Sequence, residues 1–175
     1  MTKSQIQLIV IMMVAFVSLG GSYLLFYFAK TEGGWGTTNN GVFVTPQTTL
    51  AELGWQVEGK FAQDVEGHWW LWVVTDDCDA GCQQSIKDLR ALHVLLNKEA
   101  ERVRRGFTGS ERAWQKLAEQ FPALAHVRLS SGRSLENGIY IADPLGNLVF
   151  HYAPNTNPKL VQEDLKKLLK VSQIG

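Results

Sequence analysis

Cysteine is scarce in this chain of 175 residues, and neither sign of charge is in excess. Two cysteines cannot build a disulfide-rich scaffold, which excludes a small domain held together by several bridges. Lysine plus arginine number 17, as do aspartate plus glutamate, so no nucleic-acid partner is expected. A phosphate-binding glycine loop, a serine-histidine-aspartate pattern and internal repeats are also missing. The chain has instead one long apolar run and one close cysteine pair, Cys78 and Cys82.

The apolar run, Ile6–Ala29, contains no charged residue. As a helix, a run of this length spans the roughly 30 Å of hydrocarbon in a bilayer. Tyr23 and Tyr27 suit a membrane interface. A cleaved signal peptide is the alternative, but its apolar region is shorter, and no A-x-A-like cleavage site follows the run. We therefore expect an uncleaved single-pass anchor.

Charges beside this run predict its orientation. Lys3 and the amino terminus lie on one side, whereas Lys30 on the other side is offset by Glu32. The positive-inside rule then places the amino terminus in the cytoplasm. The chain is thus predicted to be a single-pass inner (cell) membrane protein whose C-terminal domain faces the periplasm, a compartment that permits disulfides.

Composition divides the chain into three parts. Residues 1–30 are the anchor, and residues 31–54, rich in glycine, threonine and asparagine, are a juxtamembrane linker. The linker contains GVFVTP, a candidate edge strand that Pro46 ends. Residues 55–175 form the folded domain.

The domain alternates strand and helix patterns. The run HWWLWVV (68–74) is aromatic and β-branched, which predicts a buried central strand. A helix is expected from Asp79 to Asn97, because apolar side chains recur there at spacings of three and four: Ile86, Leu89, Leu92 and Leu96. RVRRGF (102–107) is a strand candidate. Its basic cluster, RVRR, fits a solvated strand edge, or contact with an anionic lipid or an acidic partner.

Turn and cap signals place the later elements. TGSE (Thr108–Glu111) fits a capping box that opens a helix, and Pro122 ends that helix. HVRLS predicts a short strand, and GIYIADPLGNLVFHY predicts two strands about a tight turn. The last helix starts with Asn157 as N-cap and Pro158 at its first position.

This order of elements predicts an α/β fold: a thioredoxin-like mixed sheet flanked by helices and preceded by one transmembrane helix. Early strands that alternate with helices need parallel crossovers, whereas the late hairpin is antiparallel. We expect helices on both faces of the sheet. In the thioredoxin fold a cysteine pair lies where the first strand passes to its helix, which is the position of Cys78 and Cys82.

The spacing of the cysteine pair allows three kinds of site. Helical residues four apart are close enough for Cys78 and Cys82 to form a disulfide or to bind one soft ion such as Cu(I). The start of a helix favours the Cys78 thiolate, whereas Asp76, Asp77 and Asp79 oppose it. A structural staple is the third reading, although so short a loop gains little entropic stabilisation.

The stretch WLWVVTDDCDAGCQQSIKDLRAL resembles the strand, cysteine loop and helix of the Sco/SenC proteins. GIYIADPLGNLVFHY and LVQEDLKKLL are similar to their late hairpin and final helix, so the resemblance covers residues 55–170. These proteins are membrane-anchored, thioredoxin-fold factors for cytochrome c oxidase assembly with a Cys-x-x-x-Cys site. Thioredoxins instead use Cys-x-x-Cys, which this chain lacks.

The chain departs from the Sco/SenC pattern at two places. The prolines that follow the family's cysteines are missing from Cys78-Asp79-Ala80-Gly81-Cys82-Gln83. The family's third copper ligand, a histidine before the late hairpin, is absent from SSGRSLENG (130–138). The chain has four histidines, each expected at the surface or half-buried: His68, His93, His126 and His151. Of these, His126 is the best candidate for a ligand from outside that stretch.

The resemblance implies a factor that assists haem-copper oxidase assembly by dithiol chemistry at the copper subunit. Cys78 would attack a target disulfide and Cys82 would resolve it, which would be thiol–disulfide oxidoreductase activity. One alternative is a Cu(I) metallochaperone in which Cys78 and Cys82 are metal ligands. A second alternative is a docking module that binds through the tryptophans at 69, 70 and 72. The expected partners are respiratory oxidase subunits or other assembly factors, and the membrane.

Overall fold

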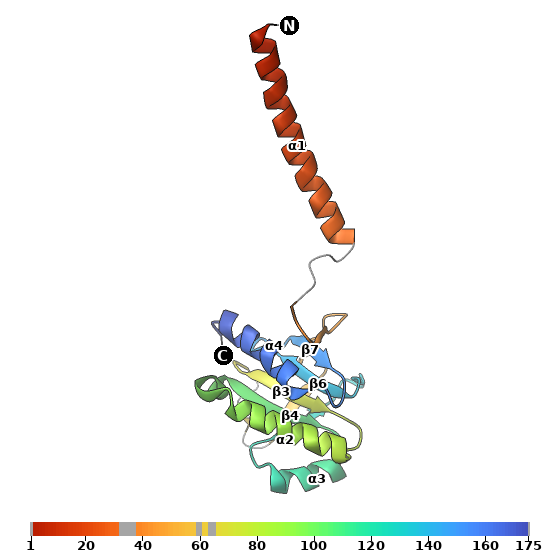
Figure 1. The fold of residues 1–175 in the computed structure, drawn as a ribbon. Coiled ribbons are helices and arrows are strands. Elements are labelled where there is room, and N and C mark those ends of the chain that lie inside the picture. Colours follow the sequence, from red (N-terminus) through yellow and green to blue (C-terminus); the bar gives the residue numbers. More distant parts are fainter. Residues whose placement is uncertain (1, 32–37, 59–60, 63–65, 175) are drawn as a thin grey trace. The chain divides into compact units, whose positions relative to one another are not determined.

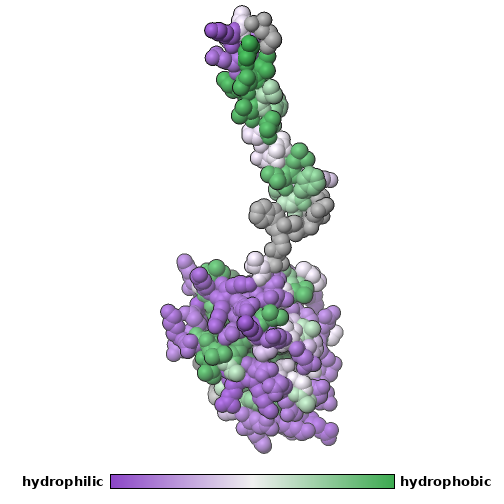
Figure 2. Space-filling model, viewed as in Figure 1, coloured by the Kyte–Doolittle hydropathy of each residue, from purple (hydrophilic) through white to green (hydrophobic). Residues whose placement is uncertain are grey.

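The computed structural model describes residues 2–31, 38–58, 61–62 and 66–174. The chain forms two units, Met1–Thr38 and Asn39–Gly175 (Figure 1). The described part of the first unit is dominated by helix α1, Lys3–Thr31. Its segment Lys3–Ala29 has a mean hydropathy of 2.3, enough by length and composition to cross a membrane. Hydrophobic side chains along α1 are exposed (Figure 2), which an aqueous environment would disfavour.

The described part of the second unit is a mixed sheet with three α-helices. Its strands run in the order β1-β7-β6-β3-β4-β5-β2. Strand β3 pairs in parallel with β4 and antiparallel with β6, which confirms the predicted mixed sheet. The elements in chain order are β1 Val42–Phe43, β2 Trp55–Glu58, β3 Trp69–Val74, α2 Ala80–Val94, the 3-10 helix η2 Asn97–Arg102, β4 Val103–Thr108, α3 Glu111–Gln120, β5 Ala125–Leu129, β6 Gly138–Ala142, β7 Leu148–Tyr152 and α4 Pro158–Val171.

Most of the predicted elements are present. β1 is an edge strand beside β7, and β6 and β7 form the expected antiparallel hairpin. Asn157 caps α4 by accepting a hydrogen bond from the backbone N–H of Lys159 at 3.0 Å. β2 was not predicted, because four residues carry too short an alternation to be distinguished from a loop. It forms the other edge of the sheet by antiparallel pairing with β5.

The three described α-helices of this unit, α2, α3 and α4, pack on one face of the sheet, so the prediction of helices on both faces is wrong. Trp69, Leu71 and Val73 of β3 belong to a core cluster that includes buried residues of α2, α3 and α4. For α2 and α3 the reason is topological. β3, β4 and β5 are parallel neighbours that follow one another in the sheet, and right-handed crossovers in one direction place α2 and α3 on the same side.

The opposite face of the sheet carries a second core cluster, which contains three tryptophans. Trp70 and Trp72 of β3 are fully buried there, with Trp55 of β2 packed across them. The ring of Trp55 lies 5.3 Å from that of Trp70 and 4.5 Å from that of Trp72, in edge-to-face geometry. Since Trp69 is also buried, the tryptophan run is core, and an exposed docking surface made of it is excluded.

The N-cap of α3 is Ser110, not Thr108 as the capping-box prediction implied. The Ser110 hydroxyl accepts a hydrogen bond from the backbone N–H of Ala113 at 3.3 Å. Thr108 is the last residue of β4, where its hydroxyl accepts from Nε1 of Trp72 and donates to the carbonyl of Val127. Its side chain joins neighbouring strands and is not available to cap a helix.

A buried carboxylate in α4 forms hydrogen bonds with the first residues of this unit. Asp164 of α4 is fully buried and accepts hydrogen bonds from the backbone N–H groups of Asn40 at 2.6 Å and Gly41 at 2.9 Å. The Tyr152 hydroxyl donates to the same carboxylate at 3.0 Å. Burial alone would raise the pKa of Asp164, but these bonds and one from Lys167 lower it below the ordinary value.

Candidate functional site

The two cysteines lie at the junction between β3 and α2. The Thr75 hydroxyl donates to the carbonyl of Asp77 at 2.8 Å, which turns the chain after the strand. Asp79 is the N-cap of α2 and accepts from the backbone N–H of Cys82 at 2.9 Å. Cys78 therefore precedes the helix, and Cys82 lies in its first turn.

Cys78 and Cys82 are joined by a disulfide, with their Cα atoms 5.1 Å apart. That separation lies within the usual range for a bridge. Both residues are half-buried and pack against the core cluster on the helical face of the sheet. The predicted pair is thus brought together, in the oxidised state.

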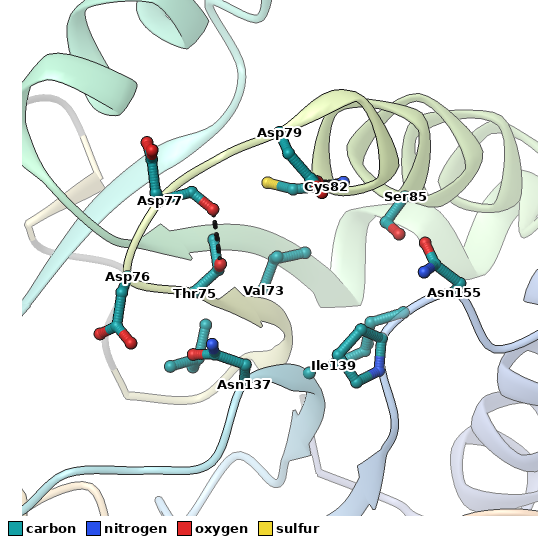
Figure 3. Close-up of a pocket in the computed structure, with 13 residues that line it drawn as sticks. Val73, Thr75, Asp76, Asp77, Asp79, Cys82, Ser85, Asn137, Ile139 and Asn155 are labelled. Atoms are coloured by element: carbon teal, nitrogen blue, oxygen red, sulfur yellow. Dashed lines mark hydrogen bonds between the residues drawn. The ribbon is translucent and has the colours of Figure 1, made fainter.

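A cleft of about 380 Å³ opens beside the disulfide. Figure 3 shows Asp79 and Cys82 at the start of α2, with Asn137 and Ile139 across the cleft and Asn155 beside Ser85. Cys78 is not among the described residues that line this cleft. Of the two cysteines, Cys82 is therefore the one that borders the cleft.

The cleft is acidic. Its described lining includes Asp76, Asp77 and Asp79 and no lysine, arginine or histidine. Oδ1 of Asp77 accepts from the backbone N–H of Cys78 at 3.0 Å, and Asp79 accepts from that of Cys82. Two carboxylates thus occupy backbone donors that could otherwise stabilise a thiolate at the helix start.

These aspartates should slow the reaction of the disulfide with anionic thiols. We expect Asp76→Asn combined with Asp77→Asn to raise the rate of reduction by glutathione, because each removed charge lessens repulsion of the glutathione thiolate. The rise should be roughly twofold to fivefold at low ionic strength and should vanish in 1 M salt. Asp88→Asn, on α2 but outside the cleft lining, is the matched control. An equal rise in the control, or a rise that salt does not remove, would contradict this account.

A side chain at Gly81, between the cysteines, would displace the side chain of Asn155. A Cβ at Gly81 would lie 2.8 Å from Oδ1 of Asn155, which follows β7 and has a left-handed φ of 64°. Asn137 and Asn155 were not identified from the sequence as site residues. Each lies in a loop distant in sequence from the cysteines, and no local pattern marks it.

The described residues do not supply a third copper ligand. The loop before β6 is the stretch in which the Sco/SenC pattern has a histidine. In this chain that loop contributes Asn137 to the cleft. Nδ1 of His126 lies 3.1 Å from Glu58, and its ring stacks on Trp114 at 4.5 Å, away from the cleft lining. No group of three histidine, cysteine or acidic side chains suited to a metal occurs in the part of the chain described. The pair alone offers two sulfur donors, which does not match a three-ligand copper site.

The remaining histidines are also held elsewhere. Nε2 of His151 lies 3.4 Å from the carbonyl of Asn137, but His151 lines a different cavity. Nε2 of His93 lies within hydrogen-bond distance of the carbonyls of Ala100 and Val103. His68 is placed against the carbonyl of Glu66. None of the four histidines lines the cysteine cleft.

Solved structures with a similar fold include Sco proteins, in agreement with the sequence resemblance. Apo Sco1 from Thermus thermophilus is 16% identical with a TM-score of 0.56, covering 76% of this chain and 98% of that one. Yeast Sco1 with copper bound is 12% identical with a TM-score of 0.51, covering 67% and 87%. A thiol-disulfide isomerase from Corynebacterium glutamicum is 16% identical with a TM-score of 0.50, covering 66% and 89%. At these identities the likeness shows a thioredoxin-like fold.

A family model defines the chain more closely. No curated protein matches the sequence. The model described as "transmembrane-like, thioredoxin-like, C-terminal domain" matches residues 69–172, from β3 to the end of α4. Together with the apolar helix α1, this match indicates a single-pass membrane protein with a thioredoxin-like domain. The chain belongs to the transmembrane-like, thioredoxin-like C-terminal domain family.

Proposed function

We propose that this protein is a membrane-anchored thiol–disulfide exchange factor that assists assembly of a respiratory haem-copper oxidase at its copper subunit. The observation that carries the proposal is the Cys78–Cys82 disulfide beside an open cleft at the strand-to-helix junction of a thioredoxin-like domain. The link to the oxidase rests on the resemblance to the Sco/SenC proteins. The anchor is in the inner membrane, and the domain works in the periplasm.

The disulfide would oxidise a target dithiol in two exchanges. A target thiolate attacks Sγ of Cys82, a mixed disulfide forms, and Cys78 leaves as a thiolate that takes a proton from water. The second target thiolate then attacks the target sulfur and releases Cys82. The target loses two electrons and the cysteine pair gains them, so the reverse sequence reduces a target disulfide. This order, with Cys82 as the exchanging sulfur, reverses the one expected from the sequence and follows from the cleft lining.

Complementation tests this function in the cell. A strain lacking the gene should lose oxidase activity and copper-subunit levels, and wild-type protein should restore both. A chain with Cys78→Ser and Cys82→Ser should accumulate in the membrane without restoring them. Normal oxidase in the deletion strain would refute the link to the oxidase. Restoration by the double variant would instead assign a docking role that needs no cysteine.

Cu(I) transfer is the second candidate function, favoured by the two neighbouring sulfurs and by the likeness to yeast Sco1 with copper bound. The reduced full-length chain in detergent should be titrated with Cu(I) against a competing chelator, beside the double Cys→Ser variant. Thiol exchange predicts weak or cysteine-independent binding. Tight binding at a stoichiometry near one, lost in the variant, would establish copper carriage and require a third ligand.

A further inference from the structure

The acidic side chains of the cysteine cleft have no cationic partners. Asp76, Asp77 and Asp79 are exposed, and none of them forms an ion pair within the described residues. Asp77 accepts one backbone N–H and Asp79 another. The carboxylate of Asp76 makes no hydrogen bond to any described residue. Because an ionised carboxylate has about four sites for accepting hydrogen bonds, most of this capacity is open to a molecule in the cleft.

Two uncommitted amides border the same cleft. Asn137 precedes β6 and Asn155 follows β7, and neither side-chain amide forms a hydrogen bond within the described part of the chain. Figure 3 shows Asn137 across the cleft from the start of α2 and Asn155 beside Ser85. Each amide can donate through its NH₂ group and accept through its oxygen. These two functions complement the carbonyl and the N–H of a peptide backbone.

The composition of the cleft favours one class of occupant. Its volume, about 380 Å³, lies in the range of pockets that enclose a ligand. No lysine, arginine or histidine is among its described lining residues, so an anionic thiol such as glutathione is repelled without a compensating cation. A positively charged group is attracted instead, and the amides suit a peptide backbone. A peptide with a basic side chain satisfies both parts of the lining.

We propose that the cleft binds a segment of the target protein that carries lysine or arginine next to its reacting cysteine. Asp76 and Asp77 pair with the basic side chains, and the amides of Asn137 and Asn155 bind the peptide backbone. The sulfur of the segment is thereby brought to Cys82, the cysteine that borders the cleft. This binding step rests on the proposed thiol–disulfide exchange, for which it selects the partner, and it adds no chemical step.

Binding is tested with peptides that cannot react. Two peptides of one sequence, with serine in place of both cysteines, carry either lysine or glutamate beside those positions. Each is titrated calorimetrically into the oxidised full-length chain in a non-ionic detergent. The lysine peptide should bind at least about fivefold more tightly at low ionic strength, and the difference should shrink as salt screens the charges. Equal affinities, or no binding of either peptide, would overturn the proposal.

Variants separate the charge contacts from the backbone contacts. Asp76→Asn with Asp77→Asn should remove most of the preference for lysine, whereas Asp88→Asn, outside the lining, should retain it. Asp79 stays unchanged because it caps α2. Asn155→Gly, which still allows the left-handed backbone, should weaken both peptides by roughly threefold and leave their ratio unchanged, because amide contacts do not distinguish charge. A preference that survives in the double variant, or unchanged affinities in Asn155→Gly, would overturn the proposal.

Reactive versions of the same peptides distinguish a failure of this selection from a failure of the exchange function. With both cysteines restored and reduced, the lysine peptide should be oxidised at least about fivefold faster than the glutamate peptide at low ionic strength. Equal exchange rates would overturn the selection and leave the exchange function standing. If the inert lysine peptide binds preferentially but neither dithiol peptide is oxidised, the peptide site stands and the exchange function is refuted.

Discussion

A full-length chain carrying Cys78→Ser and Cys82→Ser is expected to lose all thiol–disulfide exchange while keeping its fold. Neither sulfur is needed to hold the sheet, because the core on both of its faces is made of large apolar side chains. Closing so short a loop stabilises a protein by only about 2 kcal/mol. Exchange with a dithiol-containing peptide, followed by mass spectrometry, should fall to the uncatalysed rate, because the double variant has no cysteine left. Urea unfolding should show a decrease of about 2 kcal/mol in the free energy of unfolding.

The single variants distinguish the roles of the two sulfurs. Cys78→Ser leaves the Cys82 thiol in the cleft, where a mixed disulfide with a target can form and is not resolved. Cys82→Ser leaves only Cys78, outside the cleft lining, and should trap roughly tenfold less target, a difference set by access to the sulfur. Equal trapping would show that the cleft does not select between them. Greater trapping by Cys82→Ser would restore Cys78 as the attacking residue.

Among the residues that link the start of the second unit to α4, Asp164 is expected to give the most destabilising substitution, Asp164→Ala. It leaves the backbone N–H groups of Asn40 and Gly41, and the hydroxyl of Tyr152, without their acceptor. Breaking a buried charged network of this kind costs about 3–5 kcal/mol. Urea unfolding measures the loss. Glu163→Ala, one position earlier and exposed, is the control and should change stability by less than about 0.5 kcal/mol. A loss below about 1 kcal/mol for Asp164→Ala would show that these hydrogen bonds contribute little to the free energy of unfolding.

The same carboxylate should make stability depend on pH in acid. The folded-state pKa of Asp164 lies below its unfolded value. Its stabilising contribution is therefore complete above the unfolded pKa of about 3.9 and is lost as the pH falls through the folded pKa. Other carboxylates titrate in this range as well, so the relevant quantity is the difference between wild type and Asp164→Asn. That difference should shrink below about pH 3.9, and a constant difference would assign the effect to packing instead.

Local sequence patterns predicted most of the fold, because strand and helix periodicity and capping residues act over a few positions. They did not identify the face on which α3 packs, which depends on the order of β5 in the sheet. They also missed charged residues whose burial depends on distant segments. Arg105 was grouped with a surface cluster, and Asp164 resembles any acidic residue of an amphipathic helix.

The candidate site, like the fold, was only partly predictable from the sequence. The cysteine pair and its acidic loop are contiguous in sequence, so their proximity followed from spacing alone. The opposite wall of the cleft did not, because Asn137 and Asn155 come from loops on either side of the β6–β7 hairpin. The lack of a histidine before that hairpin was visible in the sequence. Only the structure shows that no other described histidine takes its place.

The bond between Asn40 and Asp164 also has a consequence for the order of events during synthesis. The two residues are 124 positions apart, and Asp164 lies in the last helix of the chain. At about 5–20 residues per second, the ribosome adds those positions in roughly 6–25 s. During that interval the first segment of the domain lacks its partner, although the anchor has already been made. Completion of this fold therefore follows synthesis of the anchor and waits until α4 has been made.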